Sequence, residues 1–204
     1  MALDVNSPQK WEADYQGKTD GWDLAGPTPA LKRVAASGRF PPGRMLVPCA
    51  GRGHDAREFA RRGFDVTAVD FSPSAVREMR RLSDPDAPME ILQHDMFKLP
   101  RALDGEFDYV LQYTCFCAID PNRRDDYADL VARLLKPGGT YIDLAFPLDG
   151  RPGGPPFSVS ETEIVSLFER RGFKMVSREK LEDSVSPRRD AEELLVFRKV
   201  EGFS

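Results

Sequence analysis

Short apolar runs alternate with helical segments along most of this chain, and that alternation is the feature that most restricts its fold. Strand-like runs are expected at residues 45–47, 66–69, 89–93, 107–112, 141–146, 174–178 and 194–198. Helical patterns separate most of them, at residues 54–62, 72–82, 123–135 and 161–170. Strands that alternate with helices at this spacing predict an α/β fold: a doubly wound, Rossmann-like, mostly parallel sheet of seven strands with helices on both faces.

The beginning of the chain stands apart from this alternation. It holds three large aromatic residues among polar ones and two short helical patterns, and it ends where Pro41-Pro42-Gly43 breaks the chain. We therefore expect a single domain overall, in which residues 1–42 form an N-terminal helical cover and residues 43–204 form the α/β domain.

Composition and charge exclude several classes of protein. The 204 residues are 41% hydrophobic and 30% charged, which suits one folded domain with a full core. Lys and Arg number 29 against 33 Asp and Glu, so the net charge of −4 offers no basic surface to nucleic acid or a membrane. No signal sequence or membrane-spanning run is evident, and the odd count of three cysteines favours a reducing compartment. We expect a cytoplasmic protein, as a monomer or weak dimer, that binds neither nucleic acid nor membrane.

A glycine-rich turn follows the first expected strand. In Gly51-Arg52-Gly53 the bare backbone can approach a ligand closely, and the next helix offers free N–H groups. Asp70 closes the second expected strand, where an acid accepts hydrogen bonds from ribose hydroxyls in nucleoside-binding folds. Together these features predict a nucleoside-type ligand, and the alternative is an ordinary tight turn with a surface aspartate. Ala56 occupies the third glycine position of the dinucleotide-binding Gly-x-Gly-x-x-Gly fingerprint, which tolerates alanine there. A dinucleotide therefore stays an alternative ligand.

Further motifs flank the later strands. Residues 94–97 end the third strand, residues 107–110 open the fourth, and the Leu-Leu-Lys-Pro-Gly-Gly segment at 134–139 precedes the fifth. With the glycine turn and Asp70, this set resembles the class I S-adenosylmethionine-dependent methyltransferases. The resemblance implies that the third strand contacts the adenine and that the end of the fourth strand faces the reacting methyl group.

Motifs outside that common set narrow the resemblance. They are Trp11-x-x-x-Tyr15-x-Gly17-Lys18-Thr19 before Trp22-Asp23, Gly51-Arg52-Gly53-His54-Asp55 after Pro48, Tyr113-Thr114-x-Phe116-Cys117-Ala118-Ile119, Pro121-x-x-Arg124-x-x-Tyr127, and Gly153-Gly154-Pro155-Pro156-Phe157. From about residue 11 to 167 the chain resembles the thiopurine S-methyltransferase family, above all its branch of halide and thiol methyltransferases. It departs from the relatives at Cys49-Ala50, where they often carry Gly-Cys, and at Gln112, where they often carry an acid.

The resemblance implies a role for particular residues toward S-adenosylmethionine and its methyl acceptor. The aromatic side chains of Trp11, Tyr15 and Trp22 would cover the cofactor. Cys49 and Gly51 would contact its methionine part, and Asp70 would contact its ribose. Asp95 and Met96 would contact its adenine. Tyr113 would be the catalytic residue, close to both the sulfonium and the nucleophile, and the Gln112 amide would bond the cofactor's ammonium. The acceptor pocket would contain Phe116, Arg124 and Phe157.

The chemistry fits the scarcity of candidate bases and metal ligands. Methyl transfer to an anionic nucleophile needs alignment in a dry pocket rather than a strong base. The only histidines are His54 and His94, and no metal-spaced cluster of His, Cys and Asp is present. We predict an S-adenosylmethionine-dependent methyltransferase that acts on a small soft nucleophile, above all a thiol or sulfide sulfur, without metal. The alternatives are a halide or thiocyanate acceptor, an oxygen or nitrogen of a small metabolite, and a non-catalytic cofactor-binding module.

Two segments between the expected elements are interpreted as loops. Residues 147–157 are expected to lie over one end of the sheet. Residues 186–190, which include Arg188 and Arg189, are expected to form a solvated turn between the last two strands.

Overall fold

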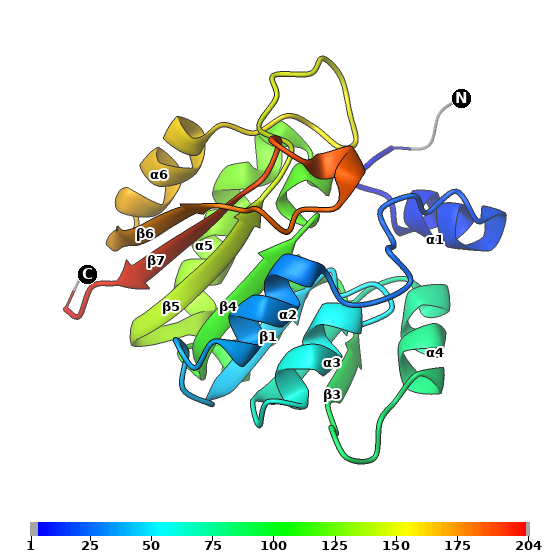
Figure 1. Cartoon of the computed structure of the whole chain (residues 1–204), viewed down its shortest axis with the longest axis horizontal. Coiled ribbons are helices and arrows are strands. Elements are labelled where there is room, and N and C mark those ends of the chain that lie inside the picture. Colours follow the sequence, from blue (N-terminus) through cyan, green and yellow to red (C-terminus); the bar gives the residue numbers. More distant parts are fainter. Residues whose placement is uncertain (1–3, 203–204) are drawn as a thin grey trace. The chain divides into compact units, whose positions relative to one another are not determined.

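A computed structural model describes residues 4–202 and divides the chain into two compact units, Met1–Leu99 and Pro100–Ser204 (Figure 1). The first unit contains three parallel strands in the order β3-β2-β1: β1 (Arg44–Pro48), β2 (Asp65–Asp70) and β3 (Glu90–Gln93). Its helices are α1 (Pro8–Gly17), α2 (Pro29–Ala36), α3 (His54–Ala60) and α4 (Pro73–Arg81), with a 3-10 turn at Met96–Lys98. Helix α1 packs against α4, and α2 packs against α3.

The second unit contains four strands in the order β4-β5-β7-β6. They are β4 (Phe107–Tyr113), β5 (Leu135–Ala145), β6 (Phe173–Lys180) and β7 (Glu193–Lys199). Strands β4 and β5 are parallel, whereas β7 runs antiparallel to both β5 and β6. The helices are α5 (Arg124–Leu134) and α6 (Glu161–Glu169), and 3-10 turns lie at Arg101–Leu103, Phe116–Ala118, Pro121–Arg123 and Ser186–Arg188.

The predicted α/β fold with seven mostly parallel strands is confirmed. Each expected strand and helix is present, with ends that differ by a few residues. The exception is β5, which begins at Leu135 and so includes the Lys-Pro-Gly-Gly segment predicted as a turn. Pairing with β4 shifts at this point, because Phe107 faces Leu135 but Tyr109 already faces Thr140. The turn residues thus bulge out between two paired stretches. The proposed division at residue 42 stays a prediction.

Local sequence signals explain where the helices begin. Ser72 caps α4 by accepting a hydrogen bond from the Ala75 N–H at 3.2 Å, and Ser160 caps α6 by accepting one from the Glu163 N–H at 3.1 Å. Aromatic packing then joins α6 to the sheet of the second unit, since the Phe168 ring stacks on Tyr141 at 4.4 Å between centroids. Between residues 4 and 202, no helix is both long enough and apolar enough to cross a membrane.

Candidate active site

The turn after β1 depends on left-handed backbone. Cys49, Gly51 and Gly53 have φ angles of 48°, 56° and 71°. A Cβ atom on Gly53 would lie 2.6 Å from Cγ of Met79, so that position requires glycine. A Cβ atom on Gly51 would lie 3.1 Å from the Tyr15 hydroxyl. Gly51 therefore keeps the backbone bare next to the Tyr15 hydroxyl, and Gly53 leaves room for Met79.

Asp70, at the end of β2, connects this turn to the start of α4. One carboxylate oxygen accepts a hydrogen bond from the Gly51 N–H at 2.9 Å, and the other accepts one from the Ser72 N–H at 2.9 Å. Burial raises the pKa of Asp70 to about 6, and these hydrogen bonds oppose that rise. A carboxylate has about four acceptor positions, so Asp70 retains capacity for ribose hydroxyls.

Three aromatic side chains of the N-terminal segment lie together. The Trp22 ring meets the rings of Trp11 and Tyr15 edge-on, with 5.5 Å between centroids in each pair. Burial, together with the charge of Asp70, raises the pKa of Tyr15, so its hydroxyl remains protonated. The structure therefore brings together the predicted cover residues, Gly51 and Asp70, a set that suits a nucleoside with a cationic sulfonium.

An ion-pair network supports the outer side of this cluster. The Arg52 guanidinium pairs with Asp20 and Asp23, and it lies 5.3 Å from the centre of the Tyr15 ring. Burial opposes ionisation of Asp23, but hydrogen bonds from His54 and the Ala25 N–H, with the charge of Arg52, lower its pKa to about 2. Asp23 is thus a stable anion that holds Arg52 beside Tyr15.

Glu12 is a residue that the sequence analysis missed. Its carboxylate accepts hydrogen bonds from the hydroxyls of Ser72 and Ser74, both at 2.6 Å, and from the Ser74 N–H at 3.0 Å. Burial opposes ionisation, yet these bonds lower the pKa of Glu12 to about 2. Glu12 lies between two predicted cover residues on α1, so its bonds fasten that helix to the N-terminus of α4. A single acid next to Trp11 carries no sequence signal that could have revealed this contact.

The remaining predicted residues of the first unit lie at the ends of β1 and β3. The sulfur of Cys49 is 3.6 Å from that of Met96. Asp95 accepts a hydrogen bond from the Phe97 N–H at 3.0 Å and so begins the short 3-10 turn that contains Met96. Met96 is buried. Their roles toward the cofactor stay predictions.

Tyr113, at the end of β4, is half-buried and belongs to a hydrogen-bond network with two buried residues of the second unit, Arg188 and Glu192. Its hydroxyl donates to a Glu192 oxygen at 2.7 Å and accepts from the Arg188 guanidinium at 2.6 Å. Burial raises the pKa of Tyr113, so the phenol stays protonated. The Arg188 guanidinium also lies 5.1 Å from the Tyr113 ring centre and 5.2 Å from that of Phe146.

The burial of Arg188 corrects the interpretation of residues 186–190 as a solvated turn. Only 6% of Arg188 is exposed, whereas its neighbour Arg189 faces solvent. Two aromatic rings and the Tyr113 hydroxyl take the place of water around this cation. Sequence reasoning could not separate the two adjacent arginines, because the packing partners lie far away in the chain.

The predicted acceptor-pocket residues pack around one ion pair. Phe116 is buried, and the Arg124 guanidinium lies 5.0 Å from its ring centre. Arg124 donates to both carboxylate oxygens of Glu163, at 2.7 and 2.8 Å, and to the Ser158 carbonyl at 3.0 Å. The Phe157 N–H donates to the Cys117 carbonyl at 2.7 Å. Arg124 thus anchors the loop that carries Phe157, and a direct role toward the acceptor stays a prediction.

Gln112 has a structural role inside the second unit. Its amide nitrogen donates to Asp143, and its carbonyl oxygen accepts from the backbone N–H groups of Cys115 and Phe116, at 3.3 and 3.1 Å. These bonds order the chain after β4 rather than leave the amide poised for a cofactor ammonium. Burial also raises the pKa of the Cys117 thiol to about 12, so this cysteine is no ready nucleophile. Across residues 4–202, no group of three or more His, Cys, Asp or Glu side chains is placed to hold a metal ion.

Comparison with solved structures identifies the fold. The chain aligns over 96% of its length with a structure from a study of the conversion of a disulfide bond into a thioacetal group during echinomycin biosynthesis, with a TM-score of 0.77, 20% identity and 94% of that chain covered. It also aligns, with a TM-score of 0.70 and 20% identity, with 1,6-didemethyltoxoflavin-N1-methyltransferase of Burkholderia thailandensis bound to S-adenosylhomocysteine, covering 98% of this chain and 94% of that one. The fold is that of a class I S-adenosylmethionine-dependent methyltransferase.

Sequence comparison identifies the family. The model of the thiopurine S-methyltransferase family matches residues 6–201. "Probable thiol methyltransferase 2" of Arabidopsis thaliana is 37% identical, with 98% of this chain and 89% of the relative covered. "Thiocyanate methyltransferase 1" of Brassica oleracea is 33% identical over 93% of this chain and 84% of its own. The chain belongs to the thiopurine S-methyltransferase family, and it is an S-adenosylmethionine-dependent enzyme with a small-molecule methyl acceptor.

Proposed function

We propose that the protein is a thiol S-methyltransferase that methylates the sulfur of a small thiol or sulfide. The observation that carries this proposal is the buried Arg188 guanidinium, which bonds the Tyr113 hydroxyl at the end of β4 and offers a cation to an anionic nucleophile. A thiolate is such a nucleophile, and it reacts without a base in the transfer step. The 37% identity to a probable thiol methyltransferase supports the same acceptor.

The bond changes need little acid–base chemistry from the protein. S-adenosylmethionine supplies an electrophilic methyl group on a cationic sulfur. A thiolate lone pair forms the new S–C bond as the old sulfonium–carbon bond breaks, and one positive and one negative charge disappear together. The thiol proton passes to solvent water before transfer, and the Arg188 guanidinium lowers the energy of the resulting anion. Tyr113, whose hydroxyl accepts a hydrogen bond from Arg188, positions that cation for the anion.

The first unit would hold the nucleoside. We propose that Asp70 accepts hydrogen bonds from the ribose hydroxyls and that the backbone at Gly51 lies against the methionine part. The aromatic faces of Trp11, Tyr15 and Trp22 would cover the cofactor, since aromatic faces attract a cation and exclude water. Asp95 and Met96 would contact the adenine. The hydrogen-bonding capacity left on Asp70 supports this arrangement.

A halide or thiocyanate acceptor is the second candidate. Thiocyanate methyltransferases of two plants match at 32–33% identity over 93% of the chain, and a thiocyanate or halide ion would meet the same buried guanidinium. An oxygen or nitrogen acceptor fits less well, because it must lose a proton that is harder to remove than that of a thiol.

A panel assay tests the acceptor class. Purified protein and S-adenosylmethionine would be incubated with hydrosulfide, methanethiol, an aromatic thiol, thiocyanate, iodide, a phenol or an amine, and release of S-adenosylhomocysteine would be measured. We expect the highest kcat/KM for the sulfur nucleophiles, among which hydrosulfide and methanethiol come first. Turnover of iodide or thiocyanate alone would favour the second candidate, and turnover of the phenol or amine alone would contradict both.

A further inference from the structure

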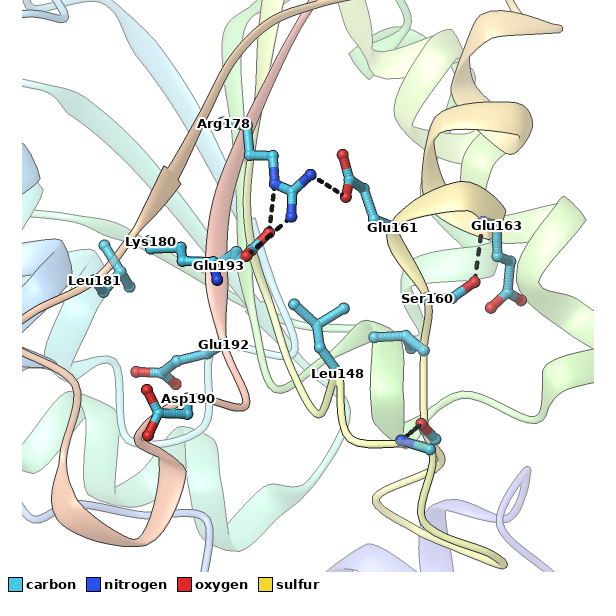
Figure 2. Close-up of a pocket in the computed structure, with 13 residues that line it drawn as sticks. Leu148, Ser160, Glu161, Glu163, Arg178, Lys180, Leu181, Asp190, Glu192 and Glu193 are labelled. Carbon is cyan, nitrogen blue, oxygen red and sulfur yellow. Dashed lines mark hydrogen bonds and ion pairs between the residues drawn. The ribbon is translucent and has the colours of Figure 1, made fainter.

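A cavity of about 570 Å³ lies in the second unit, beside the Tyr113 network. Its wall comes from the loop after β5, the start of α6 and the facing ends of β6 and β7 (Figure 2). Sites for organic ligands commonly have volumes of ~300–1,000 Å³. The cavity is therefore much larger than a hydrosulfide or thiocyanate ion needs.

Three carboxylates of the wall take part in ion pairs. Arg178 pairs with Glu161 at 2.6 Å and with Glu193 at 2.7 Å, as Figure 2 shows. Glu163 is held by Arg124 at 2.7 Å. These three carboxylates share two cations, Arg178 and Arg124, and their ion pairs hold the wall together. The wall has two further carboxylates, Asp190, which is exposed, and Glu192, which is buried. The buried one, Glu192, distinguishes the cavity.

Glu192 is buried and only half satisfied. The residue is 3% exposed, and one of its oxygens accepts the Tyr113 hydroxyl at 2.7 Å. The other oxygen, Oε1, is fully buried and has no hydrogen-bond partner within residues 4–202. A buried carboxylate oxygen without a donor costs free energy of about 1–3 kcal/mol or more. A ligand with N–H donors and a positive charge would remove that cost.

We propose that this cavity binds the ammonium group of the methyl acceptor, which makes the preferred substrates aminothiols. The inference rests on the proposed thiol S-methyltransferase function and names its substrate class. Glu192 connects the two parts of such a molecule, because its carboxylate bonds Tyr113, beside the sulfur, and the same residue lines the cavity. An ammonium offers three N–H donors, and its bond to a carboxylate is stronger than one between neutral groups.

Binding of methylated products tests the cavity independently of turnover. Calorimetry would measure the affinity of the protein, saturated with S-adenosylhomocysteine, for 2-(methylthio)ethylamine and for the neutral 2-(methylthio)ethanol. We expect the amine to bind at least tenfold more tightly, and we expect Glu192→Gln to reduce that ratio to below threefold. Lys180→Gln, which changes a charge on the same wall but leaves Glu192 intact, is the matched control and should retain the preference.

Each other result overturns the inference. Equal binding of the two products by the unaltered protein excludes an ammonium site, and a preference that survives in Glu192→Gln places it elsewhere. If Glu192→Gln no longer binds S-adenosylhomocysteine, Lys180→Glu is tested in its place. The added carboxylate should strengthen binding of the amine at least threefold. Unchanged binding of the amine would contradict an ammonium site in this cavity. Turnover of hydrosulfide would be measured in the same preparations. Turnover without a preference for the amine would contradict only the ammonium site, whereas a lack of turnover would contradict the proposed function.

Discussion

Glu12 on α1 accepts two hydrogen bonds from Ser74 on α4, one from its hydroxyl at 2.6 Å and one from its N–H at 3.0 Å. The bond to the N–H satisfies a free donor at the N-terminus of α4, where the helix dipole also favours an anion. Because Glu12 lies next to Trp11 and one turn from Tyr15, this contact positions the helix that carries two of the proposed cover residues.

Loss of the Glu12 charge should weaken cofactor binding. We expect Glu12→Gln to raise the Kd for S-adenosylhomocysteine by about three- to tenfold, because hydrogen bonds to a charged group contribute about 1.5–3 kcal/mol and the amide retains part of them. Calorimetry would measure this Kd. Asp14→Asn, on the same helix but paired with Lys10, should leave it unchanged. An unaltered Kd in Glu12→Gln would mean that α1 plays no part in binding.

The same contact predicts how stability depends on acid pH. The pKa of Glu12 is lowered from 4.5 to about 2, so its stabilising bonds are fully present above pH 4.5 and are lost as the pH falls toward 2. Urea unfolding between pH 5 and pH 3 should therefore show a smaller loss of stability in Glu12→Gln than in the unaltered protein. Parallel losses in both proteins would contradict this assignment.

Replacement of Asp70 should separate binding from folding. We expect Asp70→Asn to weaken S-adenosylhomocysteine binding at least tenfold, because the amide accepts fewer hydrogen bonds than the carboxylate. The pKa of Asp70 is raised from 3.8 to about 6, so the native state holds this proton longer than the unfolded chain, and stability falls as the pH rises from about 4 to 6. Asp70→Asn removes the cost of ionising this buried group at pH 7, and this gain offsets the hydrogen bonds lost to Gly51 and Ser72. The free energy of unfolding at pH 7 should therefore change by less than about 2 kcal/mol.

Asp70 also predicts a pH dependence of binding. The Kd for S-adenosylhomocysteine should rise as the pH falls below about 6, where the carboxyl group becomes protonated. This rise should be absent in Asp70→Asn. A rise of the same size in the variant would assign the effect to another group.

Arg188 should support turnover more than cofactor binding. We expect Arg188→Met to lower kcat/KM for a thiol by about 10²-fold, a loss typical of one preorganised charge at a reacting group. The Kd for S-adenosylhomocysteine should change less than threefold. Arg189→Met, which removes the adjacent solvent-facing guanidinium, is the control and should keep full activity. Equal losses in both variants would contradict a specific role for the buried cation.

Substitution of Gly53 by alanine should destabilise the protein more than the same substitution at Gly38, whose backbone angle is nearly the same. Gly38 has φ 70°, and a Cβ atom added there would meet open space, whereas a Cβ atom on Gly53 would lie 2.6 Å from Met79. We expect Gly38→Ala to cost about 1 kcal/mol for the left-handed backbone alone. Gly53→Ala should cost about 2–4 kcal/mol, because overpacking adds to it. Urea unfolding of the two variants would measure the difference, and equal costs would show that Met79 moves aside freely.

Local sequence was sufficient for the elements and for part of the candidate site. Apolar runs and helical patterns located the strands and α-helices, except for the start of β5, and Ser72-Pro73 marked the start of α4 because a capping residue and proline act within one helical turn. The left-handed turn at Gly51 and Gly53 and the acid at Asp70 were readable for the same reason, since each depends on the chain within or beside one strand.

The sequence by itself therefore determined the strand and helix pattern, the glycine turn and the family. Only the tertiary structure decided that Glu12 bonds Ser74, that Arg188 rather than Arg189 is buried on Tyr113, and that one oxygen of Glu192 has no donor within the described residues. The partners in the first two pairs lie 62 and 75 residues apart. No local periodicity encodes such contacts, because they depend on which side chains the packed elements bring within hydrogen-bond distance.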